Sequence, residues 1–185
     1  MRIITGTARG RNLKSPKGLR VRPTSDRVRE SLFSILGNEV VDVGVMDLFA
    51  GTGSLGLEAL SRGAQRAIFV EKNPAALKCL KENIAICGFE ERSKVVASSV
   101  VPFLNTAIVP EETGIIFIDP PYSSHEAIKV LLAFSKHVKS LSGCRIVLEH
   151  SPSLPPDPVP EFLEIIDSRN YGDTVLTFFE IKGGL

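Results

Sequence analysis

After residue 40 the chain alternates short apolar runs with helix-like segments, and this rhythm limits the possible folds more than any other feature. The strand-like runs cover residues 45–50, 67–71, 93–98, 114–119 and 144–149. The helical patterns between them cover residues 54–63, 74–87, 99–108 and 125–139. A repeated strand–helix–strand order is typical of a mostly parallel sheet with helices on both faces. The sequence therefore predicts an α/β fold.

The N-terminal part of the chain does not follow this rhythm. Residues 2–5 and 11–14 predict a small hairpin. Residues 25–36 predict a helix, which Thr24 or Ser25 would cap at its start. The apolar residues of that helix that should face the core are Val28, Leu32, Ile35 and Leu36.

The C-terminal part predicts two further strands. Residues 152–160 contain five prolines and are interpreted as a loop. The strand-like residues 162–169 and 174–181 follow that loop and are expected to close the same sheet as a hairpin. We therefore expect one domain over residues 1–185, in keeping with the length of the chain.

Charge is distributed unevenly along the chain, although the net charge is only +1. Residues 1–29 contain nine Arg or Lys side chains and a single acid, Asp26. This split indicates that the basic end contacts a polyanion, and the alternative is a solvated basic tail. We expect residues 1–38 to form a basic extension that packs on a core of residues 39–185.

A glycine-rich segment lies between the first predicted strand and helix of the core. It runs from Asp47 to Gly56 and contains the pattern GxGxxG, beginning at Gly51. Such loops occur in both dinucleotide sites and S-adenosylmethionine sites. Glu71 ends the next strand, where its carboxylate can accept hydrogen bonds from an adenosine ribose. The extra acid Asp47 would attract a cationic ligand, which favours S-adenosylmethionine; alternatively, the glycines only shape a turn.

The most informative segment is Asp119-Pro120-Pro121-Tyr122, which follows an apolar strand. In an open parallel sheet, ligands bind beyond the carboxyl ends of the strands, so Asp119 should lie on the same edge as the glycine loop. The Asp119 carboxylate and the Pro120 carbonyl can both accept hydrogen bonds from one NH₂ group, and Tyr122 can stack on a planar base. These residues predict methyl transfer to an amine; the alternative is a strand-end turn with a buried Tyr.

Three stretches resemble a known class of enzymes: residues 47–64, 70–84 and 118–122 resemble class I S-adenosylmethionine-dependent methyltransferases that act on amino groups of nucleic acid bases. The N-terminal residues 2–11 and 22–33 resemble the RsmD family, which methylates N2 of a guanine in bacterial small-subunit (16S) ribosomal RNA. The resemblance implies a Rossmann-like, seven-stranded sheet whose last strand is antiparallel.

The resemblance also implies a set of site residues. The residues expected to hold the target base are Asp119, Pro120, Pro121 and Tyr122. The residues expected to hold the cofactor are Asp47, Phe49, Ala50, Gly51, Thr52, Gly53, Glu71, Lys72 and Asn73. Ser98 and Ser99 stand where related enzymes contact adenine, often through Asp or Asn. The residues expected to bind RNA are Arg9, Arg11, Lys14, Arg20, Arg22, Thr24, Arg27 and Arg29. Thr24, Asp26 and Arg27 are also expected to line the base or cofactor pocket.

The expected function is guanine-N2 methylation of small-subunit ribosomal RNA with S-adenosylmethionine. The expected partner is that RNA or an assembling 30S particle, and the chain is expected to act as a monomer without a metal. The alternatives are methylation of adenine N6 in DNA or of a glutamine side chain, a non-catalytic RNA-binding assembly protein, and a nicotinamide dehydrogenase. Three cysteines without a CxxC pair and no long apolar run indicate a cytoplasmic protein rather than a secreted or membrane protein.

Overall fold

The computed structural model describes residues 1–16, 26–121 and 124–182. These residues form a seven-stranded sheet with the order β3-β2-β1-β4-β5-β7-β6, in which β7 runs antiparallel to the other six strands. The strands are β1 Gly44–Leu48, β2 Arg66–Glu71, β3 Ser93–Ala97, β4 Thr113–Ile118, β5 Arg145–His150, β6 Leu163–Asn170 and β7 Val175–Ile181. The predicted α/β fold, with its antiparallel last strand, is confirmed.

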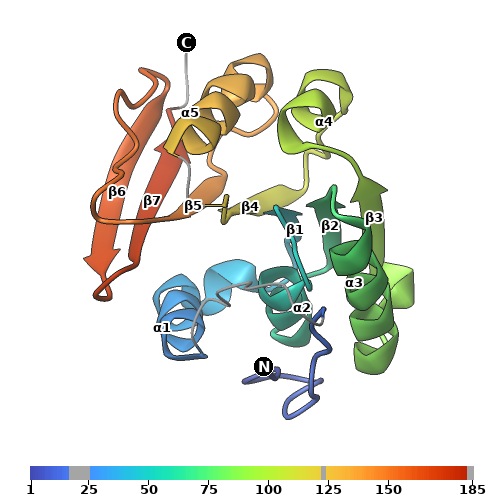
Figure 1. The fold of residues 1–185 in the computed structure, drawn as a ribbon. Coiled ribbons are helices and arrows are strands. Elements are labelled where there is room, and N and C mark those ends of the chain that lie inside the picture. The colour runs from blue at the N-terminus through green and yellow to red at the C-terminus, as the bar shows by residue number, and fades with distance from the viewer. Residues whose placement is uncertain (17–25, 122–123, 183–185) are drawn as a thin grey trace.

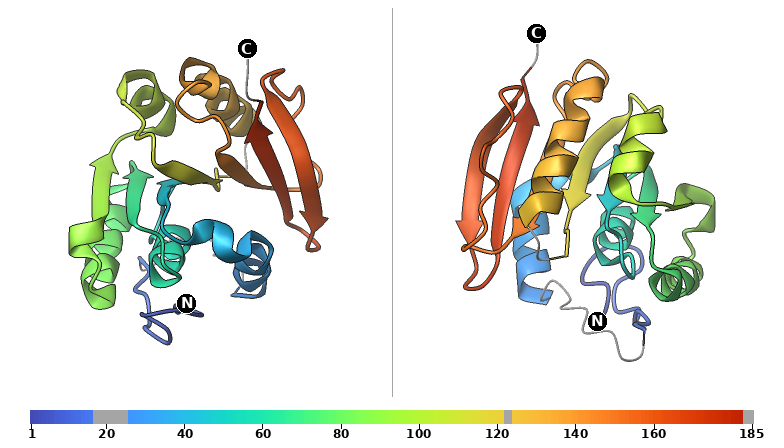
Figure 2. Two further views of the ribbon diagram at one scale, coloured as in Figure 1. Left: turned by 180° about the vertical axis from the view of Figure 1, so that it is seen from behind. Right: turned by 45° about the horizontal axis from the view of Figure 1, so that its top comes forward.

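Helices cover both faces of this sheet (Figures 1 and 2). One face is packed against α1 Asp26–Leu36, α2 Ser54–Ser61 and α3 Pro74–Cys87, and the other against α4 Val100–Thr106 and α5 Ser124–Ala133. Three 3₁₀ turns complete the described elements: η1 Gly37–Val40, η2 Glu90–Arg92 and η3 Phe134–His137. The helical pattern predicted over 125–139 therefore divides into α5 and η3.

The central strand β1 contributes side chains to the core on both faces of the sheet. Every residue of β1 is buried, as expected for a parallel strand covered on both faces. Side chains alternate between the faces, so Val45 packs with the α1–α2–α3 side while Met46 and Leu48 pack with the α4–α5 side. The same alternation directs Asp47 to the side of Val45. The strand order reverses between β1 and β4, and ligands bind open α/β sheets at such a point.

Helix α1 differs from the sequence prediction in the residues that it buries. Its buried residues are Val28, Arg29, Leu32, Phe33 and Leu36. Ile35, which was expected in the core, is 38% exposed, and Phe33 takes the buried position instead. Spacing alone fits both residues, because Ile35 follows Leu32 by three positions and Phe33 precedes Leu36 by three, so the packing of the helix on the core decides between them.

The predicted N-terminal hairpin exists only as a short pairing. Arg2 and Asn12 form an isolated antiparallel bridge, and the Ile3 amide donates to the Arg11 carbonyl. The loop between them packs very closely on α2, because a Cβ added to Gly6 would lie 1.7 Å from the Ser61 carbonyl oxygen. Gly6 also has φ +87°, so the left-handed conformation and the close approach both require glycine there.

Polar groups on α2 and α3 hold the N-terminal segment in place. The Glu58 carboxylate accepts hydrogen bonds from the backbone amides of Ile4 (2.8 Å) and Thr5 (3.0 Å). On α3, the Asn83 side chain bonds both the amide and the carbonyl of Lys14, and it also donates to the Thr52 carbonyl. The basic segment is thereby attached to the loop that follows β1.

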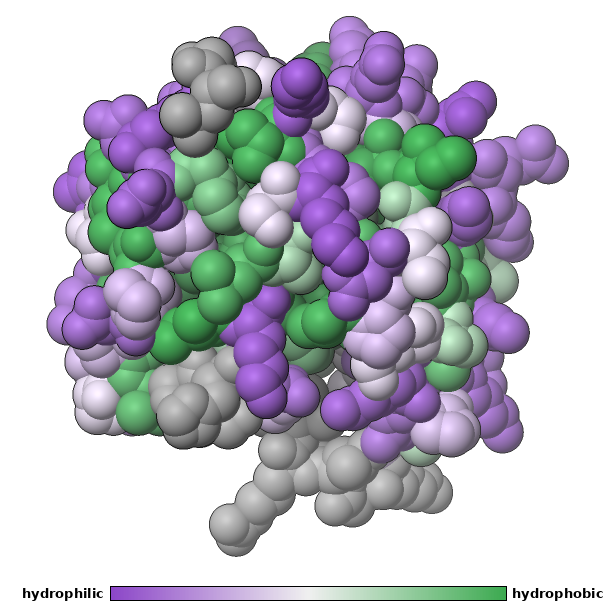
Figure 3. Space-filling model, turned by 90° about the horizontal axis from the view of Figure 1, so that it is seen from above, coloured by the Kyte–Doolittle hydropathy of each residue, from purple (hydrophilic) through white to green (hydrophobic). Residues whose placement is uncertain are grey.

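The outer side of α4 and α5 mixes residue types. Hydrophobic and hydrophilic side chains are interspersed on that side of the molecule (Figure 3).

Among the described residues, no helix combines the length and the apolar character needed to cross a membrane.

Candidate active site

A cavity of about 600 Å³ lies at the carboxyl ends of the central strands, a volume typical of small-molecule sites. Its walls come from the segments that follow β1, β2, β3 and β4, from α5, and from the N-terminal segment. The residues that line it are Met1, Ser15, Phe49, Ala50, Gly51, Thr52, Ser54, Val70, Glu71, Lys72, Asn73, Ala76, Ser98, Ser99, Val100, Val101, Pro102, Asp119, Pro120, Pro121, Glu126, Lys129 and Val130. The two motifs that the sequence analysis singled out therefore meet in one cavity.

The glycine loop turns sharply as it leaves β1. Phe49 has φ +68°, a left-handed conformation that is uncommon for a residue with a side chain. Such backbone strain costs on the order of 1–3 kcal/mol and concentrates at ligand-binding sites. The Ala50 amide bonds the Val70 carbonyl (3.0 Å), which ties the loop to β2. With this backbone conformation, the Phe49 side chain lies in the wall of the cavity.

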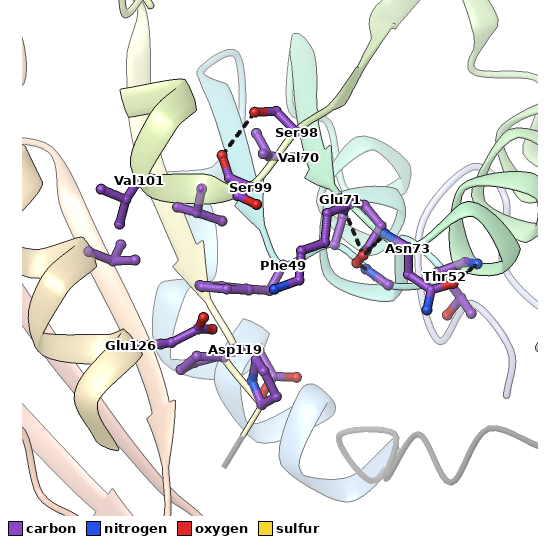
Figure 4. Close-up of a pocket in the computed structure, with 18 of the residues that line it drawn as sticks. Phe49, Thr52, Val70, Glu71, Asn73, Ser98, Ser99, Val101, Asp119 and Glu126 are labelled. Atoms are coloured by element: carbon purple, nitrogen blue, oxygen red, sulfur yellow. Dashed lines mark hydrogen bonds between the residues drawn. The ribbon is translucent and has the colours of Figure 1, made fainter. Parts of the chain in front are cut away.

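Glu71 is fixed in place by three backbone amides. One carboxylate oxygen accepts from the Gly51 amide (2.8 Å), and the other accepts from the amides of Lys72 (2.8 Å) and Asn73 (2.7 Å). Hydrogen bonds to a charged acceptor are among the strongest in proteins, so this carboxylate connects the glycine loop to the end of β2. Figure 4 shows Glu71 and Asn73 on one side of the cavity, with Phe49 between them and Asp119.

Asp47 does not line the cavity, which corrects the expectation that it contacts a cationic ligand. Its side chain is 2% exposed and accepts a hydrogen bond from the Gly56 amide (2.9 Å). Burial raises the pKa of Asp47 to about 7, and the charge of Glu71 adds to the rise. A Cβ on Gly56 would lie 2.4 Å from the Phe69 ring, so glycine lets α2 approach the sheet closely enough for this bond. Gly53 also lies outside the cavity lining.

Asp119 and its two prolines form the opposite wall. Leu48 pairs with Ile118 in the sheet, so Asp119 follows β4 at the level where Phe49 follows β1. Asp119, Pro120 and Pro121 all line the cavity. The predicted meeting of this motif with the glycine loop is confirmed, whereas Tyr122 lies outside the described residues.

The third wall is formed by the segment between β3 and α4. Ser98 and Ser99 line the cavity, as do the apolar side chains of Val100 and Val101. The Ser98 hydroxyl donates to the Ser99 carbonyl (3.0 Å) and its amide bonds the Glu71 carbonyl (3.1 Å). With Val70 and Phe49 these residues make an apolar slot with polar groups at its edge.

Arg29 is not available to RNA, which corrects the prediction for that residue. The side chain is fully buried and donates to the Arg2 carbonyl (2.6 Å) and to Asp26 (3.0 Å). Its Nε lies 3.9 Å from the Glu58 carboxylate, and burial lowers the pKa of the guanidinium. Arg29 therefore belongs to the contacts that attach the N-terminal segment to the core.

The other basic residues have mixed positions. Arg9, Arg11, Lys14 and Arg27 are exposed. Arg11 donates to the Ile86 carbonyl, and Lys14 pairs with Glu82 at 2.8 Å. The remaining predicted RNA-binding residues, Arg20, Arg22 and Thr24, lie outside the described residues.

Several cavity residues were missed by the sequence analysis. Met1 and Ser15 come from the N-terminal segment, and Glu126, Lys129 and Val130 come from α5. The spacing of the last three residues, at i, i+3 and i+4, places them on one side of a helix that starts beside the Asp119 motif. That spacing is the signal that would have indicated them.

Comparisons with known proteins agree with this geometry. A sequence model of the family described as "Conserved hypothetical protein 95" matches residues 1–180. The chain is 33% identical over 186 residues to the Bacillus subtilis protein named "Putative rRNA methyltransferase YlbH", which covers 99% of this chain and 100% of that protein. It is 43% identical over 122 residues to the Escherichia coli "Ribosomal RNA small subunit methyltransferase D", a match to 66% of this chain and 60% of that protein.

A solved structure gives the same result. The Escherichia coli protein described as "Putative methyltransferase yhhF" superimposes with a TM-score of 0.86 at 30% identity, and the match covers 100% of this chain and 99% of that one. The strand order, the glycine loop and the family match all point to the same class of protein. The chain therefore belongs to this family, the RsmD family, and has the class I methyltransferase fold.

Proposed function

We propose that this protein transfers a methyl group from S-adenosylmethionine to N2 of a guanine in small-subunit ribosomal RNA. The observation that carries the proposal is the single cavity that joins Asp119 and Pro120 to the glycine loop and Glu71. The names of the relatives from Escherichia coli and Bacillus subtilis support ribosomal RNA as the substrate. They also argue against the nicotinamide dehydrogenase alternative.

The residues present fit S-adenosylmethionine. Three backbone amides occupy three of the about four acceptor positions of the Glu71 carboxylate. The remaining position, on the oxygen that the Gly51 amide contacts, can accept from a hydroxyl of a ribose. The apolar side chains of Val70, Phe49 and Val101 suit a planar adenine ring. When bound, S-adenosylmethionine supplies the activated methyl group. The role of the protein is to hold and orient the acceptor.

Asp119 and Pro120 would hold the acceptor amine. The lone pair of the exocyclic amine of guanine is delocalised into the ring, which makes the nitrogen a poor nucleophile. Two oxygen acceptors, the Asp119 carboxylate and the Pro120 carbonyl, favour a pyramidal nitrogen with its lone pair free. Held in this way, the nitrogen would be oriented toward the methyl group of the donor, and the Asp119 carboxylate or solvent would take the proton that the methylated amine loses.

RNA binding is assigned to the basic extension of residues 1–38. The exposed side chains of Arg9, Arg11, Lys14 and Arg27 can contact phosphates. A guanine must leave its stack to enter a cavity in the protein, and phosphate contacts hold the RNA while it does. Met1 and Ser15 bring this extension to the edge of the same cavity.

The test is transfer of a labelled methyl group to small-subunit particles from cells that lack this protein. We expect Asp119→Ala to lower the rate at least about 100-fold, because it removes one of two acceptors on the reacting amine. Calorimetry should show S-adenosylmethionine binding within about 3-fold of the wild type, since Glu71 and the glycine loop are unchanged. Glu164→Ala, which removes an exposed carboxylate on β6, is the matched control.

Three results would contradict the proposal. One is a wild-type protein that binds S-adenosylmethionine but methylates no guanine N2 in these particles. Another is full turnover by Asp119→Ala. The third is faster methylation of DNA or of a protein than of the ribosomal particle.

A further inference from the structure

Glu126 lines the cavity, and one of its carboxylate oxygens has no hydrogen-bond partner. Its Oε2 is buried and has no hydrogen-bond partner. The residue lies in the first turn of α5 and lines the cavity together with Lys129 and Val130. A buried polar atom without a partner costs free energy, and a donor that arrives with a ligand, toward which the carboxylate turns, would relieve that cost.

The position of Glu126 connects it to the acceptor rather than to the methyl donor. Figure 4 shows its carboxylate directed into the cavity on the side of Asp119, across from Glu71 and Asn73. Asp119 and Pro120 form the wall that the proposed function assigns to the target base. Glu126 therefore faces the place of the base.

No contact within the described protein accounts for this carboxylate. Lys129 is its neighbour one turn along α5, yet no ion pair links the two side chains. The buried carboxylate of Glu58 on α2 is different, because it pairs with Arg62 at 2.8 Å. Most buried oxygens that have a structural role are paired with a donor.

The chemistry of guanine supplies the missing donor. The edge of guanine that carries the N2 amine also carries N1–H, whereas N1 of adenine is an acceptor. Asp119 and Pro120 are assigned to the two N2 hydrogens, which leaves N1–H unpaired. A carboxylate accepts a hydrogen bond from N1–H and repels an N1 lone pair.

We propose that Glu126 accepts a hydrogen bond from N1–H of the target base and thereby selects guanine. The inference rests on the proposed function and adds to it a residue that determines specificity. It explains how a site with acceptors for any exocyclic amine can reject adenine. Asp119 and Pro120 hold the amine, and Glu126 reads the ring atom beside it.

The test changes the protein and the base together. Mass spectrometry first maps the methylated nucleotide in small-subunit particles. Particles are then reconstituted with RNA that carries either guanine or 2-aminopurine at that position. 2-Aminopurine keeps the N2 amine, but its N1 is an acceptor. Rates are measured for the wild type, for Glu126→Gln and for the control Glu164→Gln, whose carboxylate is exposed on β6.

We expect the wild type and the control to methylate guanine at least about 100-fold faster than 2-aminopurine. Glu126→Gln should methylate guanine about 10- to 100-fold more slowly than the wild type, the discrimination typical of one base-edge contact. Its preference for guanine over 2-aminopurine should fall by at least about 10-fold, because a Gln amide can donate to N1. Such coupling between one side chain and one ring atom is not expected from a general loss of structure.

Two results separate the inference from the proposed function. If Glu126→Gln keeps the wild-type preference for guanine, the assignment of Glu126 is wrong, while guanine methylation by the wild type still supports the proposed function. If the wild type methylates no guanine N2, the proposed function fails and the assignment of Glu126 fails with it.

Discussion

Asp47 and Asp119 come from neighbouring strands, yet the structure puts them in opposite environments. Asp47 lies within β1, pairs in register with Phe117, and is 2% exposed. Asp119 comes just after β4, two residues beyond Phe117, and lines the cavity. The sequence analysis assigned both residues to the ligand site, Asp47 to the cofactor and Asp119 to the target base. Asp47 lies one residue before the end of β1 and faces the core, whereas Asp119 lies beyond the end of β4 and faces the cavity.

The comparison of Asp47 with Asp119 extends to three other carboxylates, and the five fall into two groups by their contacts. Asp47 and Glu58 are buried on the α1–α2–α3 side, where they bind backbone amides of the protein itself. Asp119, Glu71 and Glu126 line the cavity. Replacing a member of the first group should affect stability, and replacing a member of the second group should affect ligand binding or turnover.

The largest effect on stability is expected for Glu58→Ala. The substitution removes the acceptor of Ile4 and Thr5 and the partner of Arg62 (2.8 Å), and it leaves the buried Arg29 with less compensation. Breaking such a buried charge network costs about 3–5 kcal/mol of unfolding free energy. Urea denaturation measures the change.

The contrast for Glu58→Ala is Glu126→Ala, which removes a carboxylate from the cavity group. Because this side chain has a buried oxygen without a donor, its removal should change the unfolding free energy by less than about 1 kcal/mol. If both variants lost the same stability, the division into two groups of carboxylates would be wrong.

The next effect is the pH dependence that Asp47 contributes. Folding raises the pKa of Asp47 to about 7, so the folded protein binds this proton more tightly than the unfolded chain does. The contribution is fully present below about pH 4, the pKa of an unfolded Asp, and is lost as the pH rises to about 7. Over that interval, Asp47→Asn should gain on the order of 4 kcal/mol of unfolding free energy relative to the wild type.

Unfolding measured from pH 4 to pH 8 in both proteins tests this prediction, because the other titrating groups are shared and cancel in the difference. Glu164→Gln, on the exposed side of β6, gives the background for removing an exposed carboxylate. A difference between Asp47→Asn and the wild type that stays constant with pH would show that Asp47 is ionised throughout.

Much of the fold could be predicted because local patterns determine it. The helix over 74–87 has the bounds of α3, and Asn73 caps it by accepting from the amides of Ala75 and Ala76. The strand-like runs correspond to the central strands within one or two residues. The core-facing side of α1 could not be predicted fully. Phe33 and Ile35 are both apolar, and only packing decides that Phe33 is the buried one.

The site could be predicted where a motif ends a strand, and not where a contact depends on the whole fold. The motifs at Gly51 and Asp119 meet because parallel strands end at one edge. The side of the sheet that Asp47 faces could not be predicted, because a strand buried on both faces shows no alternation. Arg29 was misplaced because its charge suggested exposure, although it lies three and four residues before Leu32 and Phe33 on the buried side of α1.

The smallest expected effect extends the comparison to arginines two residues apart on α1. Arg27 is exposed and Arg29 is fully buried. Arg27→Ala should weaken RNA binding about 3- to 10-fold, and should reduce the slope of log affinity against log salt concentration by about 0.7–0.9, the share of one phosphate contact. Its unfolding free energy should stay within about 0.5 kcal/mol of the wild type, as for most surface substitutions.

Arg29→Met provides the opposite case at nearly the same place in the sequence. Methionine keeps the apolar part of the side chain but removes the charge that contacts Asp26 and Glu58, so stability falls while the salt slope for RNA stays unchanged. Filter binding at several salt concentrations, together with urea denaturation, separates the two effects. A reduced salt slope in Arg29→Met would mean that this arginine leaves its buried position to bind RNA, and that the N-terminal segment separates from α2 when it does.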